Sequence, residues 1–241
     1  MDPTVAITGA TSGIGRAVAE AFVDAGAFVA VSGRDGGTVD RTVAALNGAD
    51  SADEEDGSDP AGTAWGARAD VRDEFDLERF FERVAREAGP IDVVFANAAV
   101  LHGAPGEKPV DDLSYADYDD TMRTNARGVF ATIREAAPHL AADARIIVPS
   151  GTVAHDSTPG MGAYAVSKAA AEAVARGFAA DLDATVGVVD PGLVATDLTG
   201  KERARDPGSV APLFLWAATE ADDDDLDGER LGLREWKAAT R

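Results

Sequence analysis

Short runs of consecutive apolar residues recur along the chain, and longer segments with helical spacing of apolar positions lie between them. Each short run is apolar throughout and does not alternate with polar residues, which is typical of parallel strands covered on both faces. The runs also have the length of strands and are bounded by turn-forming residues. The sequence therefore predicts strands at 4–8, 28–32, 63–68, 91–96, 145–149, 185–189 and 230–233.

The segments between these runs have apolar residues at the spacing of one helix face. In 75–88, Leu77, Phe80, Phe81 and Val84 fall on the same face. We predict helices at 16–25, 38–46, 75–88, 115–140, 162–182 and 210–218. Strands that alternate with helices indicate an α/β fold with a parallel sheet and helices on both faces. One domain over 1–241 is expected, because this length suits one core and no linker divides the chain.

Three polar segments interrupt this pattern. Residues 47–62 are rich in Gly, Ser and Asp, and we expect an acidic surface loop there. Residues 193–206 lack clear periodicity after 196, and we interpret them as a loop that covers the substrate. The run 222–225 is expected to be a solvated acidic stretch.

Polar residues and glycines gather where the predicted strands end. In open parallel sheets, ligands bind beyond the carboxyl ends of the strands. The convergence of several such residues at one edge is harder to obtain by chance than any single motif. The residues that follow the strands are Gly9, Arg34, Asp70, Asn97, Ser150 and the pair Pro191-Gly192.

The first predicted strand leads into a glycine-rich turn and then a helix. The turn has the spacing Gly9-x-x-x-Gly13-x-Gly15. Glycines let the backbone approach a pyrophosphate closely, and the helix N-terminus offers free N–H groups and the positive end of a dipole. A turn without a ligand is the alternative, but the strand and helix stand where a dinucleotide site requires them.

The end of the second predicted strand bears on the choice of cofactor. A carboxylate at this place binds the ribose 2′-hydroxyl of NAD, whereas an arginine accommodates the 2′-phosphate of NADP. Ser32 and Gly33 stand at the strand end, and Arg34 follows them. A solvated arginine paired with Asp35 or Asp40 is the alternative reading. The sequence favours NADP over NAD.

Tyr164 and Lys168 stand four residues apart in a strongly helix-forming segment, so they lie on one face, one turn apart. A phenol has a reference pKa of about 10 and is a poor acid at neutral pH. A neighbouring lysine cation favours the phenolate and makes the group a better general acid or base. The pair by itself is common on surface helices, and its weight comes from the motifs that precede it.

The charge is the unusual part of the composition. The chain has 43 acidic and 22 basic residues, a formal net charge of -21. Such a field repels nucleic acid and anionic membranes, and its self-repulsion is relieved by salt, which indicates a protein of a high-salt cytoplasm. A mesophilic protein with an acidic loop and tail is the alternative. No apolar run reaches about 18 residues, so no membrane span is expected. With no cysteine and three scattered histidines, no disulfide and no metal site are expected.

In combination, these motifs resemble those of the short-chain dehydrogenases/reductases from residue 4 to about 235. The motifs are Thr8 to Gly15, Asn97-Ala98-Ala99, Asn125, Ser150, Tyr164-x-x-x-Lys168 and Pro191-Gly192. The resemblance implies a single-domain, Rossmann-type doubly wound sheet of about seven strands, bound NAD(P), and interconversion of a secondary alcohol and a ketone or aldehyde. The rival interpretation is a non-catalytic NAD(P)-binding sensor or scaffold of the same fold, which would be expected to have lost the Tyr/Lys pair.

The resemblance also implies roles for individual residues. Tyr164 would be the general acid or base, and Lys168 would lower its pKa and bind the nicotinamide ribose. Ser150 would hydrogen-bond the substrate oxygen, although it stands fourteen residues before Tyr164 where the family usually has thirteen, and Gly151 occupies the usual place. Asn125 would position a water in a proton relay. The residues expected to contact the cofactor are Gly9, Thr11, Ser12, Gly13, Ile14, Gly15, Arg34, Asp70, Val71, Asn97, Ala98, Tyr164, Lys168, Pro191 and Gly192.

The remaining expectations concern partners and location. A small carbonyl or alcohol substrate is expected, together with a homo-oligomeric state, either dimer or tetramer. The chain enters its first predicted strand almost at once, so we expect no signal peptide and a cytoplasmic protein. Leu101, His102, His155, Met161 and Leu193 are candidates for the substrate pocket, but they are mixed in character and identify no compound.

Overall fold

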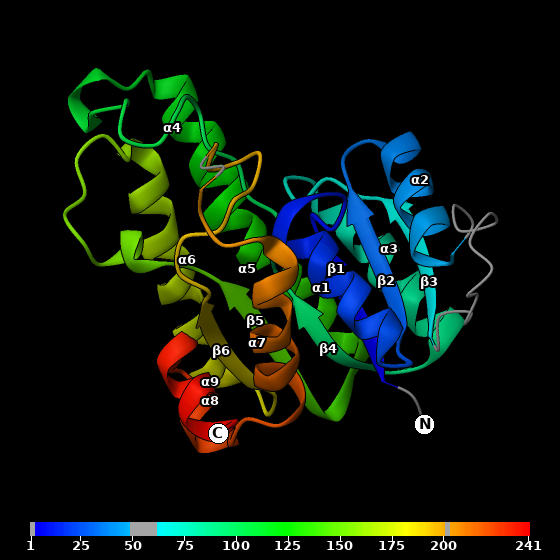
Figure 1. The fold of residues 1–241 in the computed structure, drawn as a ribbon. Helices are drawn as coiled ribbons and strands as arrows, with labels where there is room; N and C mark the ends of the chain where they lie inside the picture. Colours follow the sequence, from blue (N-terminus) through cyan, green and yellow to red (C-terminus); the bar gives the residue numbers. More distant parts are fainter. Residues whose placement is uncertain (1–2, 49–61, 201–202) are drawn as a thin grey trace.

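A parallel sheet of seven strands forms the centre of the molecule, in the order β3-β2-β1-β4-β5-β6-β7 (Figure 1). The computed structural model describes residues 3–48, 62–200 and 203–241, so most of the predicted acidic loop lies outside the described residues. The chain reverses its direction of travel across the sheet between β1 and β4, which is the topological switch point of a doubly wound fold. The strands are β1 (Thr4–Thr8), β2 (Phe28–Gly33), β3 (Thr63–Arg68), β4 (Ile91–Phe95), β5 (Leu140–Pro149), β6 (Thr185–Asp190) and β7 (Arg230–Gly232).

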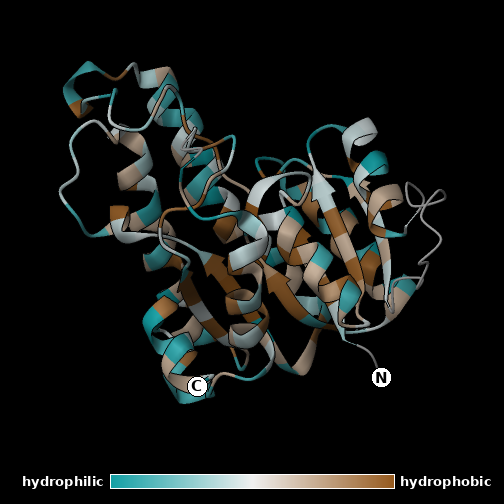
Figure 2. Ribbon diagram, in the orientation of Figure 1, coloured by the Kyte–Doolittle hydropathy of each residue, from teal (hydrophilic) through white to brown (hydrophobic). Residues whose placement is uncertain are grey.

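Helices cover both faces of the sheet, and each face has its own core. Val5 and Ile7 of β1 face one core, which is completed by α1 (Gly13–Asp24), α2 (Gly36–Leu46) and α7 (Pro207–Thr219) with residues such as Phe22 and Phe214. Ala6 faces the other core, which is completed by α3 (Glu74–Ala88), α5 (Gly128–Ala136) and α6 (Gly162–Asp181). Successive strand residues point to opposite faces, so a sheet with two covered faces needs the continuous apolar runs of the sequence. These strands are the brown interior of Figure 2.

The helices begin and end at residues with recognisable local chemistry. Asp35, Asp73, Ser114 and Asp206 cap the first turns of α2, α3, α4 and α7, each accepting a backbone N–H. The helices are α1 (Gly13–Asp24), α2 (Gly36–Leu46), α3 (Glu74–Ala88), α4 (Tyr115–Met122), α5 (Gly128–Ala136), α6 (Gly162–Asp181), α7 (Pro207–Thr219), α8 (Asp223–Leu226) and α9 (Leu233–Ala239).

The prediction of one helix over 115–140 is wrong. The chain forms α4, a π-helical turn η2 (Arg123–Arg127), α5 and a 3₁₀ turn η3 (Ala137–His139) in succession, and Leu140 already belongs to β5. Pro138 has no N–H and cannot extend α5, so the helix ends before it. Leu140 instead pairs with Ile91 of β4.

Two smaller differences lie near the C-terminus. Part of the run predicted to be merely solvated acid forms the short helix α8, because Asp222 caps it by accepting the N–H of Asp224. The sequence analysis also missed α9, which follows β7 directly and packs Leu233 and Trp236 against the first core. Helix α8 lies near the start of β6, where Thr185 donates to Asp223, whereas α9 begins at the carboxyl end of the sheet, directly after Gly232, which pairs with Asp190 at the end of β6.

The charged side chains of the described residues lie almost entirely on the surface. Within residues 3–48, 62–200 and 203–241, the buried charged side chains are Asp76, Lys168 and Glu172. Asp76 is paired with Arg68 and Arg79 at 2.7 and 2.6 Å. In the same described part of the chain, no helix has the length and apolarity needed to cross a membrane.

We expect the unfolding temperature to rise from low salt to molar salt, because a net charge of -21 repels itself until counter-ions screen it. Thermal unfolding followed by circular dichroism across a sodium chloride series measures the effect. A non-ionic osmolyte is the control, since it stabilises by exclusion from the surface without screening charge. Unfolding curves that do not move with salt would refute the halophilic interpretation.

Candidate active site

The turn between β1 and α1 depends on glycines at close backbone approaches. Gly9 has φ +66° and Gly13 has φ +56°, a region that other residues rarely adopt. A Cβ on Gly9 would lie 2.7 Å from the Cα of Ala98. Ser12 stands at the N-cap of α1 without a side-chain capping bond. The first N–H groups of this helix therefore remain available to a ligand anion.

Asn97 joins this turn to the end of β4. Its Nδ2 donates hydrogen bonds to the carbonyl oxygens of Thr8 and Gly9 at 3.0 and 2.9 Å. The backbone N–H of Asn97 donates to Thr8 Oγ1 at 3.1 Å. A Cβ on Gly15 would lie 2.4 Å from Asn97 Nδ2 and 2.5 Å from the Gly9 carbonyl oxygen, so a side chain at Gly15 would break this joint.

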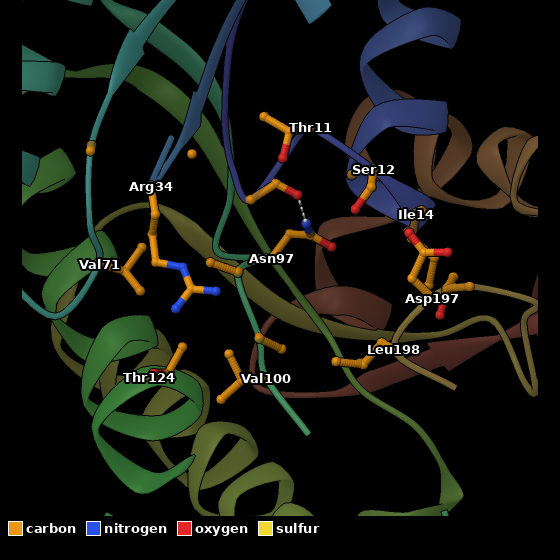
Figure 3. Close-up of a pocket in the computed structure, with 18 residues that line it drawn as sticks. Thr11, Ser12, Ile14, Arg34, Val71, Asn97, Val100, Thr124, Asp197 and Leu198 are labelled. Carbon is orange, nitrogen blue, oxygen red and sulfur yellow. Dashed lines mark hydrogen bonds between the residues drawn. The ribbon is translucent and has the colours of Figure 1, made fainter. Parts of the chain in front are cut away.

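A cavity of about 230 Å³ opens over the glycine-rich turn (Figure 3). It brings together most of the residues predicted to contact a cofactor: Gly9, Thr11, Ser12, Gly13, Ile14, Gly15, Arg34, Val71, Asn97 and Ala98. It also has lining residues that the sequence analysis did not assign: Gly33, Ala69, Ala99, Val100, Thr124, Thr196, Asp197 and Leu198. The last three belong to the segment predicted to cover the substrate, and here they form one wall of this cavity. Because the cavity lies over the predicted dinucleotide-binding turn, we refer to it as the nucleotide cavity.

Arg34 also lines a second, adjoining cavity. In Figure 3 its guanidinium extends from the end of β2 into the first cavity, toward Val71 and Thr124. The second cavity is lined by Thr11, Arg34, Asp35, Thr38, Arg68, Asp70 and Arg72. The Asp35 carboxylate is engaged in capping α2, since it accepts from the N–H and the hydroxyl of Thr38 at 2.8 and 2.6 Å.

The other guanidinium groups at this cavity are held in ion pairs. Arg72 binds both Asp70 and Asp120 at 2.7 Å, and hydrogen bonding from Arg72 lowers the pKa of Asp70. Arg68 binds Asp76 at 2.7 Å. Over the described ranges of the chain, no ion pair involves Arg34. The predicted contact residue Asp70 therefore lies beside the nucleotide cavity with its carboxylate already bonded.

Pro191 and Gly192, also predicted to contact the cofactor, follow β6 but do not line either cavity. Gly192 has φ +72°, and its N–H donates to Asp190 Oδ1 at 2.8 Å. Asp190 is in turn bonded to Arg230, so this turn is fixed from β7.

Tyr164 and Lys168 lie in the first half of α6, which extends beyond the carboxyl ends of the strands (Figure 1). Lys168 Nζ lies 5.8 Å from the centroid of the Tyr164 ring and donates to the Pro149 carbonyl oxygen at 2.9 Å. Burial raises the pKa of Tyr164 to about 12 and lowers the pKa of Lys168 to about 8. Both shifts favour the neutral forms, because burial penalises charge, so the pKa of Tyr164 is raised and not lowered as the neighbouring Lys168 had led us to expect.

Asn125 connects the Tyr/Lys helix to the nucleotide cavity. It lies buried in the π-helical turn η2, next to the cavity residue Thr124. Its Oδ1 accepts the Val100 N–H at 2.8 Å, and its Nδ2 donates to the Val100 carbonyl oxygen and to Ser167 Oγ at 2.9 and 3.0 Å. The side-chain amide is thus fully engaged in holding Val100 against α6.

Ser150 lies at the end of β5 and contacts a residue that the sequence analysis missed. Its hydroxyl donates to Glu172 Oε1 at 2.5 Å. Glu172 Oε2 lies 2.7 Å from His155 Nε2. The sequence does contain a signal for Glu172: the ionisable residues Tyr164, Lys168 and Glu172 recur every four positions, which places them on one helix face. Gly151 next to Ser150 leaves open space, since the nearest atom to a Cβ there would be Asp190 Oδ1 at 3.9 Å.

Among the described residues, no group of three or more His, Cys, Asp or Glu side chains is placed to hold a metal ion. The cavity over the glycine-rich turn and the pair of the half-buried Tyr164 and the buried Lys168 together suit a dinucleotide and a proton-transfer step.

Comparison with known proteins agrees with this geometry. A family model described as short chain dehydrogenase matches residues 3–207. An oxidoreductase from Sarocladium schorii is 32% identical over 200 residues, which cover 81% of this chain and 73% of the relative. An uncharacterized oxidoreductase from Bacillus subtilis is 31% identical over 198 residues, which cover 80% of this chain and 69% of the relative.

Solved structures share the whole fold. A short-chain dehydrogenase from Burkholderia cenocepacia in complex with NADP is 25% identical, with a TM-score of 0.81 over 96% of each chain. A dehydrogenase/reductase from Sinorhizobium meliloti is 27% identical, with a TM-score of 0.80 over 95% of this chain and 92% of that chain. These matches confirm the prediction of a Rossmann-type sheet of seven strands.

We expect Gly15→Ala to lower stability by about 1–3 kcal/mol, because the new methyl group must displace the Asn97 amide or the Gly9 carbonyl. It should also weaken binding of NADPH, measured by the change in its fluorescence on titration. Gly177→Ala on α6 is the matched control, since no atom lies within 4 Å of a Cβ there and the change should stabilise the helix by about 0.5–1 kcal/mol. A Gly15→Ala protein as stable as its parent would contradict the assigned geometry.

Proposed function

Because the chain belongs to the short-chain dehydrogenase family, we propose that it is an NAD(P)-dependent oxidoreductase that interconverts a secondary alcohol and a ketone or aldehyde by hydride transfer. The observation that carries this proposal is the Tyr164/Lys168 pair on one face of α6, which is connected through Ser167 and Asn125 to the wall of the nucleotide cavity. A bound nicotinamide would supply or accept the hydride, and the protein would supply alignment and the proton.

The residues of the nucleotide cavity fit a dinucleotide. Gly9, Gly13 and Gly15 keep the backbone free of side chains where the α1 N-terminus faces the cavity, which suits a pyrophosphate. Val71 and Thr124 would line the region of the base and ribose, on the side of the cavity that Arg34 enters.

Tyr164 is the proposed general acid for carbonyl reduction and the general base for alcohol oxidation. Burial raises its pKa to about 12, so the phenol carries its proton at neutral pH but donates it less readily than a free phenol. Lys168 in its cationic form would stabilise the phenolate that remains after the proton has left.

Tyr164→Phe should leave cofactor binding nearly intact and reduce turnover by about 10²–10⁴-fold, the usual contribution of a positioned proton donor. The measurement is NADPH consumption with a panel of ketones and aldehydes, together with NADPH titration of both proteins. Tyr115→Phe is the matched control, because Tyr115 is exposed on α4. Near-normal turnover in the Tyr164 variant would rule out its assignment as the proton donor.

A second candidate function is a non-catalytic NAD(P)-binding sensor or scaffold. The observation that favours it is the state of the residues after β5: the Ser150 hydroxyl is bonded to Glu172, and residue 151 is glycine. This alternative requires tight binding of NADPH with no turnover on any carbonyl compound of the panel.

We propose Ser150 as the hydroxyl that hydrogen-bonds the substrate oxygen, with Thr152 as the rival. To act in this way the Ser150 hydroxyl must turn from Glu172 Oε1 toward the substrate. Ser150→Ala is therefore expected to reduce turnover, whereas Thr152→Val leaves it nearly unchanged. If only the threonine variant loses turnover in a side-by-side assay, the assignment of Ser150 is wrong.

NADP is the proposed cofactor in preference to NAD. Ser32 and Gly33 place no carboxylate at the end of β2, the Asp35 carboxylate caps α2, and the Arg34 guanidinium extends into the cavity. The NADP complex of the Burkholderia cenocepacia relative also supports this choice.

Arg34→Ala should weaken NADPH binding by about tenfold to a hundredfold, the loss expected for a hydrogen bond between charged groups, and should change NADH binding little. Titration with both cofactors makes the measurement. Arg86→Ala is the control, because Arg86 is exposed on α3. Equal weakening toward both cofactors would mean that Arg34 is only a surface charge.

We also propose that the chain forms a homo-oligomer, either a dimer or a tetramer. Phe130 of α5 and Val166 of α6 are exposed apolar side chains that a second copy of the chain would cover. A sedimentation coefficient of a monomer at micromolar concentration would contradict this.

A further inference from the structure

We propose that Glu172 is a positioning residue of the reaction: its carboxylate, buried one helical turn beyond Lys168, is the counter-ion that keeps the Lys168 ammonium charged. The effect on catalysis rests on the proposed function, but the attraction between the two charged side chains is a property of the folded protein alone.

The two groups share one face of α6 and the same dry surroundings. Lys168 is 8% exposed and Glu172 is 2% exposed, and residues four apart on a helix are neighbours. They are the buried charged side chains of this helix. A buried charge is costly unless an opposite charge or several hydrogen bonds compensate it. No direct ion pair joins these two described residues, since Lys168 donates to Pro149 and Glu172 is bonded to Ser150 and His155, but their opposite charges attract one another across the buried side of the helix.

Both carboxylate oxygens of Glu172 are held in place. Oε1 accepts the Ser150 hydroxyl at 2.5 Å, and Oε2 lies 2.7 Å from His155 Nε2. The His155 side chain is 50% exposed, so it lies between the carboxylate and the solvent. Because Ser150 and His155 flank the turn that follows β5, the Glu172 carboxylate fixes this turn against α6, one helical turn beyond Lys168.

Several other ionisable groups on and around α6 are neutral or have partners elsewhere. Tyr164 is on the same helix and neutral, and Asp190 at the end of β6 is bonded to Arg230. On the other elements packed against α6, Asp120 of α4 is bound by Arg72, Arg127 of η2 by Glu74, and Arg134 of α5 by Glu135. Glu172 is the group whose charge acts on Lys168 to raise its pKa.

The direction of the effect follows from these charges. Burial lowers the pKa of Lys168 to about 8, and the negative charge of Glu172 opposes this shift. Without the carboxylate, the pKa of Lys168 falls further, and the ammonium is lost at neutral pH. A neutral lysine stabilises the Tyr164 phenolate less, so the proton transfer slows.

The first measurement is the pKa of Lys168 in the free protein. The chain has four lysines: Lys108, Lys168, Lys201 and Lys237. An NMR titration of protein labelled with ¹³C at lysine Cε therefore follows few resonances, and the resonance that disappears in Lys168→Arg is that of Lys168. Glu172→Gln, which is nearly isosteric, should lower the pKa of Lys168 by about one unit or more. Glu87→Gln, an exposed carboxylate on α3, is the control and should leave it unchanged. An unchanged pKa of Lys168 in a folded Glu172→Gln protein would overturn the proposal.

The second measurement is the pH profile of kcat for carbonyl reduction. In the parent, kcat should fall above about pH 8, where Lys168 loses its proton. In Glu172→Gln this fall should begin at lower pH, so that kcat at pH 8 is about tenfold lower than in the parent and recovers at acidic pH. A merely structural role predicts instead a uniform loss at every pH together with a lower unfolding temperature, and that result would also overturn the proposal. A protein with no turnover in the parent itself refutes the proposed function, whereas the NMR titration still decides the ionic relation.

Discussion

The hydrogen bonds of the Asn97 side-chain amide hold together the part of the molecule around the nucleotide cavity. It binds the carbonyl oxygens of Thr8 and Gly9, while the Thr8 hydroxyl accepts from the Asn97 N–H and donates to Phe95. These bonds join β1 to β4, the two strands between which the sheet changes direction. Because the amide occupies the space beside Gly15, a side chain at this position would disrupt the connection between β1 and β4. The glycine is therefore needed for the packing of the turn, quite apart from any ligand that the turn binds.

A second buried amide extends this arrangement across the molecule. Asn125 holds Val100, which lines the nucleotide cavity, and also binds Ser167, the residue before Lys168 on α6. The cavity and the Tyr/Lys helix are therefore positioned by hydrogen bonds from the same side chain. The π-helical turn η2 makes this possible, because its wider backbone turn interrupts the regular helix at Asn125, and such turns are frequent at functional sites.

The sequence predicted the elements whose apolar patterns are regular. All seven strands and most of the cavity residues follow from buried runs and from the positions just beyond them. The prediction over 115–140 failed because apolar spacing alone does not reveal a π turn, and it gave too little weight to Pro138 as the end of a helix. Helix α9 was missed because it is short and directly continues β7. The four-residue repeat singles out Glu172, but its bond to Ser150 could not be predicted, since that bond comes from tertiary packing of β5 against α6.

The residues after β5 show why spacing within a motif can mislead. Gly151 has an extended backbone with φ -173°, and a Cβ there would meet nothing closer than 3.9 Å, so neither strain nor crowding demands a glycine at this position. The hydroxyl lies one residue earlier, at Ser150, and there it is bonded to a carboxylate that also holds His155. A hydroxyl that donates its only proton to Glu172 has none to donate to a carbonyl oxygen. The hydrogen bonding of Ser150 and the charge beside Lys168 thus depend on the same buried carboxylate, and Glu172→Gln would alter both at once.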